Sequence, residues 1–244
     1  MALSFVVLGM ALAFLIAAIL VEAATMFMAD PMTNIMPISW DQAFFKLIDF
    51  PDESELKNGQ ILFDMKMLED DTVIAQSIGL VEASPRACFE VVRNYNHYSK
   101  TMPYTVEGRI IREFSIDRNR SWNEAVDFWT RVCVFGFKTG YLLRVAHLND
   151  PEKNLYQSYW TLVGNPSADS YCIDANMRPC KNDLDMNIGS HLFEPYQGNP
   201  ARTIHTYTLK IKGKSWAQRI GLRVGCGNSM REVTESIRNA VIKK

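Results

Sequence analysis

The 244-residue sequence lacks the short motifs that mark the common enzyme classes. It contains no GxSxG, HExxH, GxGxxG or Walker pattern. Gly221, Gly225 and Gly227 are loosely spaced, but they follow a helical segment rather than a strand, so they do not predict a phosphate-binding loop. The four histidines never occur at metal-ligand spacing; they are His97, His147, His191 and His205. We therefore expect no catalytic residues, no metal site and no cofactor.

The sequence also lacks the excess of positive charge that nucleic-acid binding requires. It has 26 Lys and Arg against 27 Asp and Glu, a formal net charge of −1, whereas release of counterions from nucleic acid needs a basic surface. The balance is uneven, because residues 202–244 carry a net charge of +8 and residues 24–201 a net charge of −8. Two interpretations stay open: the basic C-terminal part contacts anionic lipid headgroups, or it faces the acidic part within the same fold.

Cysteine is scarce, and none of the five cysteines forms a CxxC pair, which argues against redox and zinc-ribbon proteins. Cys172 and Cys180 flank a seven-residue loop rich in turn-forming residues. In an oxidising compartment this spacing predicts a local disulfide between them. Cys88 and Cys133 lie in apolar segments and are expected to be small buried hydrophobic residues.

One long hydrophobic run is present, at residues 2–21, and no charge occurs before Glu22. Twenty helical residues span about 30 Å, which is enough to cross a membrane. Val21 and Ala23 place branched and small residues before a possible cleavage site at Ala24. Residues 1–23 are therefore predicted to be a signal peptide or, alternatively, an uncleaved membrane anchor, and the rest of the chain is expected to be exported to the periplasm or secreted.

Residues 24–59 form a lead-in with one short amphipathic helix over 39–48, where Ser39 and Gln42 match a capping box. One helix, over residues 85–99, interrupts the strand-like segments that follow. Those segments are 61–68, 72–83, 105–117, 121–134, 136–149, 153–163, 190–196 and 202–213. The chain then ends in a short helix over 216–224, a break at 225–227, and a long amphipathic helix that begins at Ser229. This order predicts an α+β domain with an antiparallel sheet.

Three stretches of the sequence resemble a known superfamily: VEASPRACFEVVRNYNHYSKTMP from Val81, NLYQSYWTLV from Asn154, and IGSHLFEPYQGNPARTIHTYTLKI from Ile188. They are similar to segments of START-like (SRPBCC) proteins, which include StAR-related lipid-transfer domains, polyketide cyclases and coenzyme-Q-binding proteins. The resemblance covers residues 60–244. It implies a helix-grip fold, in which a curved antiparallel sheet wraps around a long C-terminal helix and an apolar cavity lies between them.

The alternation of side chains along the strands indicates which residues face that implied cavity. In the segment 202–213, His205, Tyr207 and Leu209 share one face, and Tyr141 and Leu143 repeat the mixture of aromatic and aliphatic character in another strand. The polar, aromatic run 94–103 after the first helix is expected to be an ordered, packed connection or, second, one rim of a ligand entrance. The residues expected to line the cavity are Tyr141, Leu143, Trp160, His205, Tyr207, Leu209, Met230, Val233 and Ile237.

Three functions are compatible with these features. The first is an exported START-like domain that binds a hydrophobic small molecule such as a lipid in its cavity, with or without transferring it. The second is an enzyme of the polyketide cyclase or dehydratase kind, with His205 and Tyr207 as acid–base groups. The third is an interaction module without a ligand, whose interior would be filled by side chains.

Overall fold

The computed structural model describes most of the chain after residue 35. The described residues are 36, 38, 40–49, 51, 53–115, 123–134, 136–164, 172–176 and 178–242. The expected signal peptide or anchor and the capping residue Ser39 lie outside them. The compact unit begins at Met36, so the second half of the lead-in packs with the rest of this unit. Within the described residues, no helix is long and apolar enough to cross a membrane.

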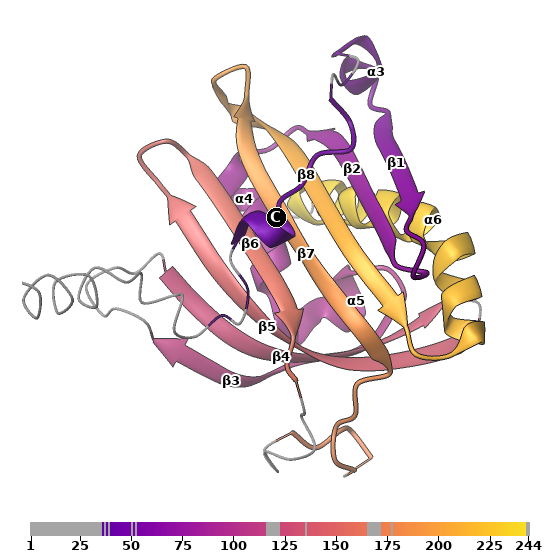
Figure 1. The fold of residues 1–244 in the computed structure, drawn as a ribbon. Helices are drawn as coiled ribbons and strands as arrows, with labels where there is room; N and C mark the ends of the chain where they lie inside the picture. Colours follow the sequence, from indigo (N-terminus) through magenta and orange to yellow (C-terminus); the bar gives the residue numbers. More distant parts are fainter. Residues whose placement is uncertain are drawn as a thin grey trace, which may run out of the picture. The chain divides into compact units, whose positions relative to one another are not determined.

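Eight antiparallel strands form one curved sheet, as predicted (Figure 1). Its spatial order is β1-β2-β8-β7-β6-β5-β4-β3. The first two strands in the sequence therefore lie beside the last one, because β2 pairs with β8. The strands are β1 (Ile61–Met67), β2 (Val73–Val81), β3 (Thr105–Ser115), β4 (Asn123–Val134), β5 (Phe137–Asp150), β6 (Leu155–Leu162), β7 (Leu184–Tyr196) and β8 (Asn199–Gly213). β7 begins six residues before its predicted start, because its first half carries polar residues that the prediction assigned to a loop.

The helical segments are α2 (Trp40–Ala43), α3 (Glu53–Lys57), α4 (Pro85–Arg93), the 3-10 helix η1 (Tyr95–His97), α5 (Tyr98–Thr101) and α6 (Trp216–Ile242). α4 begins as predicted, because the Ser84 hydroxyl accepts a hydrogen bond from the Ala87 amide at 3.3 Å and Pro85 occupies the first turn. It ends earlier than predicted, where Asn94 leaves the helical region and the chain continues as η1 and α5. The lead-in helix is also shorter than predicted, and α3 is a second lead-in helix where only the one over 39–48 was predicted.

The prediction of a broken C-terminal helix was wrong. α6 is one continuous helix of 27 residues, and the Ser229 hydroxyl donates to the Cys226 carbonyl at 3.0 Å inside it instead of capping a second helix. Glycine costs about 1 kcal/mol in a helix interior, but Gly227 lies against the Phe63 ring, where a Cβ atom would approach Cε1 to 3.1 Å. Close packing of α6 on β1 therefore compensates for the weak helix propensity of this segment.

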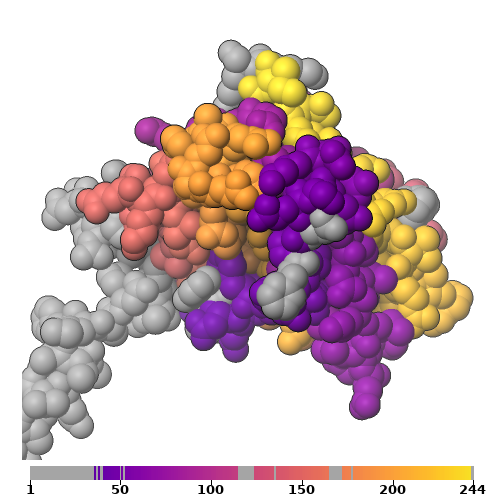
Figure 2. Space-filling model, turned by 90° about the horizontal axis from the view of Figure 1, so that it is seen from above, coloured from indigo at the N-terminus to yellow at the C-terminus, as the bar shows by residue number. Residues whose placement is uncertain are grey.

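The sheet has two differently covered faces. α4 and α6 contact the face that we call inner, and the lead-in packs on the opposite, outer face (Figure 1). There the Ala43 carbonyl accepts hydrogen bonds from Ser190 Oγ at 3.2 Å and Thr208 Oγ1 at 2.6 Å. At the end of the sheet, the turn between β7 and β8 lies beside α3, and Gln197 Nε2 donates to Glu53 Oε2 at 3.1 Å (Figure 2).

The predicted disulfide between Cys172 and Cys180 is present. It packs with Trp129 and Leu142 in a hydrophobic cluster separate from the two inner-face clusters. Cys88 is buried as predicted, whereas Cys133, near the end of β4, is only half-buried.

Candidate functional site

A cavity of about 210 Å³ lies between the inner face of the sheet and α6. Its residues come from β3 to β8, from α6, from the last turn of α4 and from the segment that connects α4 to β3. An engineered apolar cavity of about 150 Å³ already holds benzene in another protein, so this space is large enough for an organic molecule. The interior is therefore not filled by side chains, as a module without a ligand would require.

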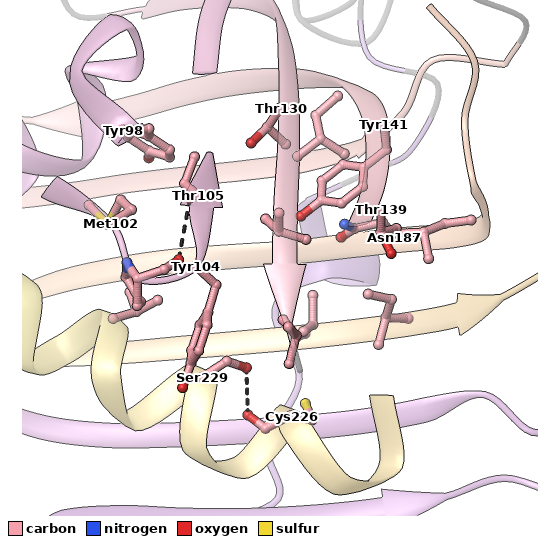
Figure 3. A pocket seen from close by; sticks show the side chains of 18 of the residues that line it. Tyr98, Met102, Tyr104, Thr105, Thr130, Thr139, Tyr141, Asn187, Cys226 and Ser229 are labelled. Atoms are coloured by element: carbon pink, nitrogen blue, oxygen red, sulfur yellow. Dashed lines mark hydrogen bonds between the residues drawn. The ribbon is translucent and has the colours of Figure 1, made fainter. Parts of the chain in front are cut away.

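The walls of the cavity combine sheet and helix side chains (Figure 3). Thr130 of β4 and Tyr141 of β5 point into the space from the sheet, and Cys226 and Ser229 approach it from α6. Further along the same cavity, the lining includes the aliphatic and aromatic side chains of Phe128, Leu143, Val145, Trp160, Leu209 and Ile211.

At one end the cavity reaches the protein surface. Phe137, at the turn between β4 and β5, belongs to the lining and is 56% exposed. Across the opening, Gly221 and Leu222 of α6 are only half-buried. Beside the loop before β3, the Tyr104 hydroxyl donates to Glu232 Oε1 at 2.8 Å and so connects this loop to α6. We call this opening the mouth.

No lining residue in the described part of the chain is Asp, Glu, Lys or Arg. The polar side chains carry hydroxyls, two amides, one imidazole, one indole N–H and one thiol. Burial raises the pKa of Tyr141 to about 12 and raises that of Tyr207 further, so both phenols stay protonated at neutral pH. A buried ion would find no counter-charge in this cavity, and the cost of leaving it unpaired is large. The site therefore suits an uncharged ligand.

The histidine His191 connects the cavity to α6 through a chain of hydrogen bonds. His191 Nδ1 lies 3.0 Å from His205 Nε2, and His205 Nδ1 lies 3.0 Å from the Thr234 hydroxyl. Burial lowers the pKa of both imidazoles, that of His205 to about 3, so both rings are neutral. Nearby, Trp160 Nε1 donates to Asn187 Oδ1 at 2.9 Å and fixes the indole against β7.

The structure brings six of the nine residues predicted to line the cavity into one lining: Tyr141, Leu143, Trp160, Tyr207, Leu209 and Val233. It places His205, Met230 and Ile237 elsewhere. His205 is buried between His191 and Thr234, Met230 packs in the core around β8, and Ile237 packs against α4. The predicted pairing of His205 with Tyr207 inside the cavity is therefore not observed, because the two His205 ring nitrogens face His191 and Thr234.

Several lining residues were not predicted from the sequence. His191 and Asn187 lie on β7, whose predicted start at 190 left too few residues to reveal which side chains share a face. Tyr95 and Tyr98 of the aromatic run also line the cavity, and the Tyr95 ring packs on Phe128 at 4.7 Å between centroids. The run 94–103 therefore forms part of the cavity wall as well as a packed connection. Met102, Pro103 and Tyr104 also belong to the lining, near the mouth.

Together, the eight-stranded curved sheet, the long C-terminal helix and the cavity between them define a START-like, helix-grip fold. No family model matches the sequence, and no curated protein matches it either.

Solved structures with this fold are similar over most of the chain. Human StAR-related lipid transfer protein 5 aligns with a TM-score of 0.58 and 12% identity over 76% of this chain and 83% of that chain. A STAR-related lipid transfer protein from Xanthomonas axonopodis aligns with a TM-score of 0.55 and 10% identity over 74% and 93%. The lipid transfer and protein localization domain of human StarD13 aligns with a TM-score of 0.55 and 14% identity over 74% and 84%. At these identities the likeness establishes the START-like fold.

Proposed function

We propose that this protein binds a lipid-like molecule in the cavity between the sheet and α6. The observation that carries this proposal is the cavity itself: about 210 Å³, lined by apolar side chains and neutral polar groups, and open at one end. Burial of an alkyl chain contributes about 0.8 kcal/mol per methylene group, so such a cavity supplies affinity without a charged contact. The solved structures of lipid transfer proteins with the same fold support the same class of ligand.

We also propose that the mouth faces a membrane when the ligand enters or leaves. Trp216 is 77% exposed and Val224 is 62% exposed, and with Ile220 they form an apolar row at four-residue spacing on the first half of α6. Lys214 lies two residues before the helix, and Arg219 and Arg223 lie on its first half, where Arg219 also pairs with Asp71 at 3.0 Å. In the sequence, no acidic residue occurs between Lys210 and Arg231. An apolar row beside basic side chains suits an anionic lipid surface.

Export of the protein remains part of this proposal. It is supported by the apolar run at residues 2–21 and by the disulfide between Cys172 and Cys180, because disulfides persist mainly in oxidising compartments. In this setting the protein would act in the periplasm or outside the cell, or from a membrane anchor formed by residues 2–21. Fractionation of cells that express the full chain, with N-terminal sequencing of the product, distinguishes cleavage before Ala24 from retention of the anchor.

Lipid binding is tested with the full chain by native mass spectrometry after mild purification, followed by extraction of the bound molecule. A matched pair of variants at Gly221 makes the test specific, since a Cβ atom there would meet open space and Gly221 lies at the mouth. Gly221→Phe is expected to obstruct the mouth and to abolish uptake, whereas Gly221→Ala is expected to keep it. A wild-type protein that is reproducibly empty and takes up no lipid from vesicles would contradict the proposal.

A further inference from the structure

The deep end of the cavity contains a row of polar side chains that face the same way from neighbouring strands. Ser158 of β6 lies opposite His191 of β7, and His191 lies opposite Tyr207 of β8. All three line the cavity. The next row of the sheet is closed by packed rings, because Phe193 and Phe89 lie 6.4 Å apart between centroids. We call Ser158, His191 and Tyr207 the polar row.

We propose that the polar row binds an oxygen function, a hydroxyl or a carbonyl, of a neutral lipid that enters the cavity with that end first. This inference rests on the proposed function and names the chemical class of its ligand. It places the uncharged oxygen at the deep end and the hydrocarbon between Trp160, Leu143 and Leu209, which lie nearer the mouth.

The first support is the hydroxyl of Ser158. The residue is fully buried, its Oγ atom has no hydrogen-bond partner within the described residues, and it belongs to the cavity lining. Buried polar atoms without a partner are rare in proteins and costly. A ligand oxygen at the deep end would supply the missing partner.

The second support is the state of His191. Its Nδ1 is engaged by His205, so Nε2 is the ring nitrogen that remains to bind a ligand in the cavity. Both rings are neutral, so each carries one N–H. If His205 donates to His191, then His191 Nε2 carries the hydrogen and donates into the cavity; if His191 donates to His205, then Nε2 accepts. The Thr234 hydroxyl serves either arrangement, because it can donate to or accept from His205 Nδ1. His191 can therefore bind a carbonyl or a hydroxyl.

The third support concerns charge. The lining contains neither a cation to neutralise a carboxylate or phosphate nor an anion to neutralise an amine within the described residues. Burial keeps His191 and His205 neutral and Tyr207 protonated. A charged headgroup at the deep end would remain unpaired, so the bound end of the ligand is neutral.

Three probes of equal chain length test the inference: 1-decanol, decane and decanoate. Each displaces a fluorescent apolar probe from the full chain at pH 7.5, in the wild type and in three variants. Ser158→Ala and His191→Phe alter the polar row. Ser77→Ala is the matched control, because Ser77 lies opposite Tyr207 on β2, is equally buried and has an equally unpartnered hydroxyl, but does not line the cavity.

We expect the ratio of decanol to decane affinity to fall about fivefold to tenfold in Ser158→Ala and in His191→Phe, as the loss of one hydrogen bond predicts, and to stay at the wild-type value in Ser77→Ala. Comparing ratios between variants cancels the different solubilities of the probes. Decanoate should bind at least about tenfold more weakly than decanol. Unchanged ratios in both variants, or decanoate binding as tightly as decanol, would overturn the inference while leaving lipid binding intact. Failure of all three probes to bind would overturn the proposed function as well.

Discussion

Nδ1 of His191 lies 3.0 Å from Nε2 of His205, and both imidazole rings are buried in the core. The His205 ring also stacks on Phe193 at 4.7 Å between centroids, and its Nδ1 meets the Thr234 hydroxyl of α6. This pair therefore joins β7, β8 and α6 behind the cavity. It also makes the fold sensitive to acid, because neither ring can accept a proton without a buried charge.

Acidification from pH 7 to pH 5 is expected to lower the free energy of unfolding. Burial lowers the pKa of His147 and of His205 to about 3 and that of His191 well below its usual value. In the unfolded chain these groups take up protons near pH 6.5, so unfolding binds protons below that pH. The free energy of unfolding therefore has its full value above about pH 6.5. It falls as the pH decreases, by up to about 1.4 kcal/mol per pH unit for each ring.

Urea unfolding at pH 7, 6 and 5 measures this effect. The lowered pKa values of Asp70 and Asp174, about 2 each, act only below about pH 4 and do not interfere. His147→Phe should reduce the pH dependence by about one third, since it removes one of three rings. A free energy of unfolding that stays constant from pH 7 to pH 5 would contradict the assignment.

Ser158→Ala is expected to stabilise the empty protein by about 1 kcal/mol, because it removes a buried hydroxyl that has no partner within the described residues. Ser190→Ala is the matched comparison, since Ser190 is equally buried but its hydroxyl bonds to the Ala43 carbonyl. That variant should lose about 1 kcal/mol. Urea unfolding of the delipidated chains measures both values. Equal changes in the free energy of unfolding in the two variants would show that the Ser158 hydroxyl does form a hydrogen bond in the folded protein.

Gly189→Ala is expected to destabilise the protein by about 1 to 3 kcal/mol through overpacking. A Cβ atom at Gly189 would lie 2.3 Å from Trp160 Cζ2 and 2.7 Å from the Thr208 carbonyl oxygen. Because Trp160 is a wall of the cavity, the displaced indole should also weaken lipid uptake. Gly221→Ala is the control, and it should stabilise α6 by about 1 kcal/mol. Thermal unfolding and uptake of a fluorescent lipid report both effects, and a neutral Gly189→Ala would contradict the observed close approach.

Replacement of Cys172 and Cys180 by Ala is expected to lower the free energy of unfolding by about 2 to 3 kcal/mol, the loop-closure contribution for a sequence separation of 8. Lipid affinity should not change, because neither cysteine belongs to the cavity lining. Urea unfolding and lipid titration of the same samples measure the two quantities. A parallel loss of affinity would mean that the disulfide supports the cavity.

Trp216→Ala is expected to reduce binding to anionic vesicles by about tenfold, because an indole that enters the membrane interface buries a large apolar area. Ile242→Ala is the control at the other end of α6, where Ile242 is 79% exposed and distant in sequence from the mouth. Vesicle sedimentation measures the binding, and zwitterionic vesicles separate the apolar contribution from the electrostatic one. Equal losses in the two variants would exclude a specific role for the first half of α6.

The sequence alone determined the order of the eight strands, most of their boundaries, the N-cap of α4 at Ser84, the disulfide and the α+β fold. These features depend on local physics: alternation of apolar residues, capping and the short separation of two cysteines. Five lining residues on strands were predictable for the same reason, because a strand's two faces follow directly from its residue order, and Val233 was predictable from the apolar face of the terminal helix.

Only the tertiary structure decided that α6 continues through Gly225 and Gly227, where packing against Phe63 outweighs the weak helix propensity. It also decided that His205 lies behind the cavity and His191 inside it. Both side chains lie on the inner face of the sheet. Whether each ring is in the core or lines the cavity depends on whether α4 and α6 cover it. The space at the deep end of the cavity likewise depends on how the sheet and the helix pack together, and the sequence of a single strand does not determine that packing.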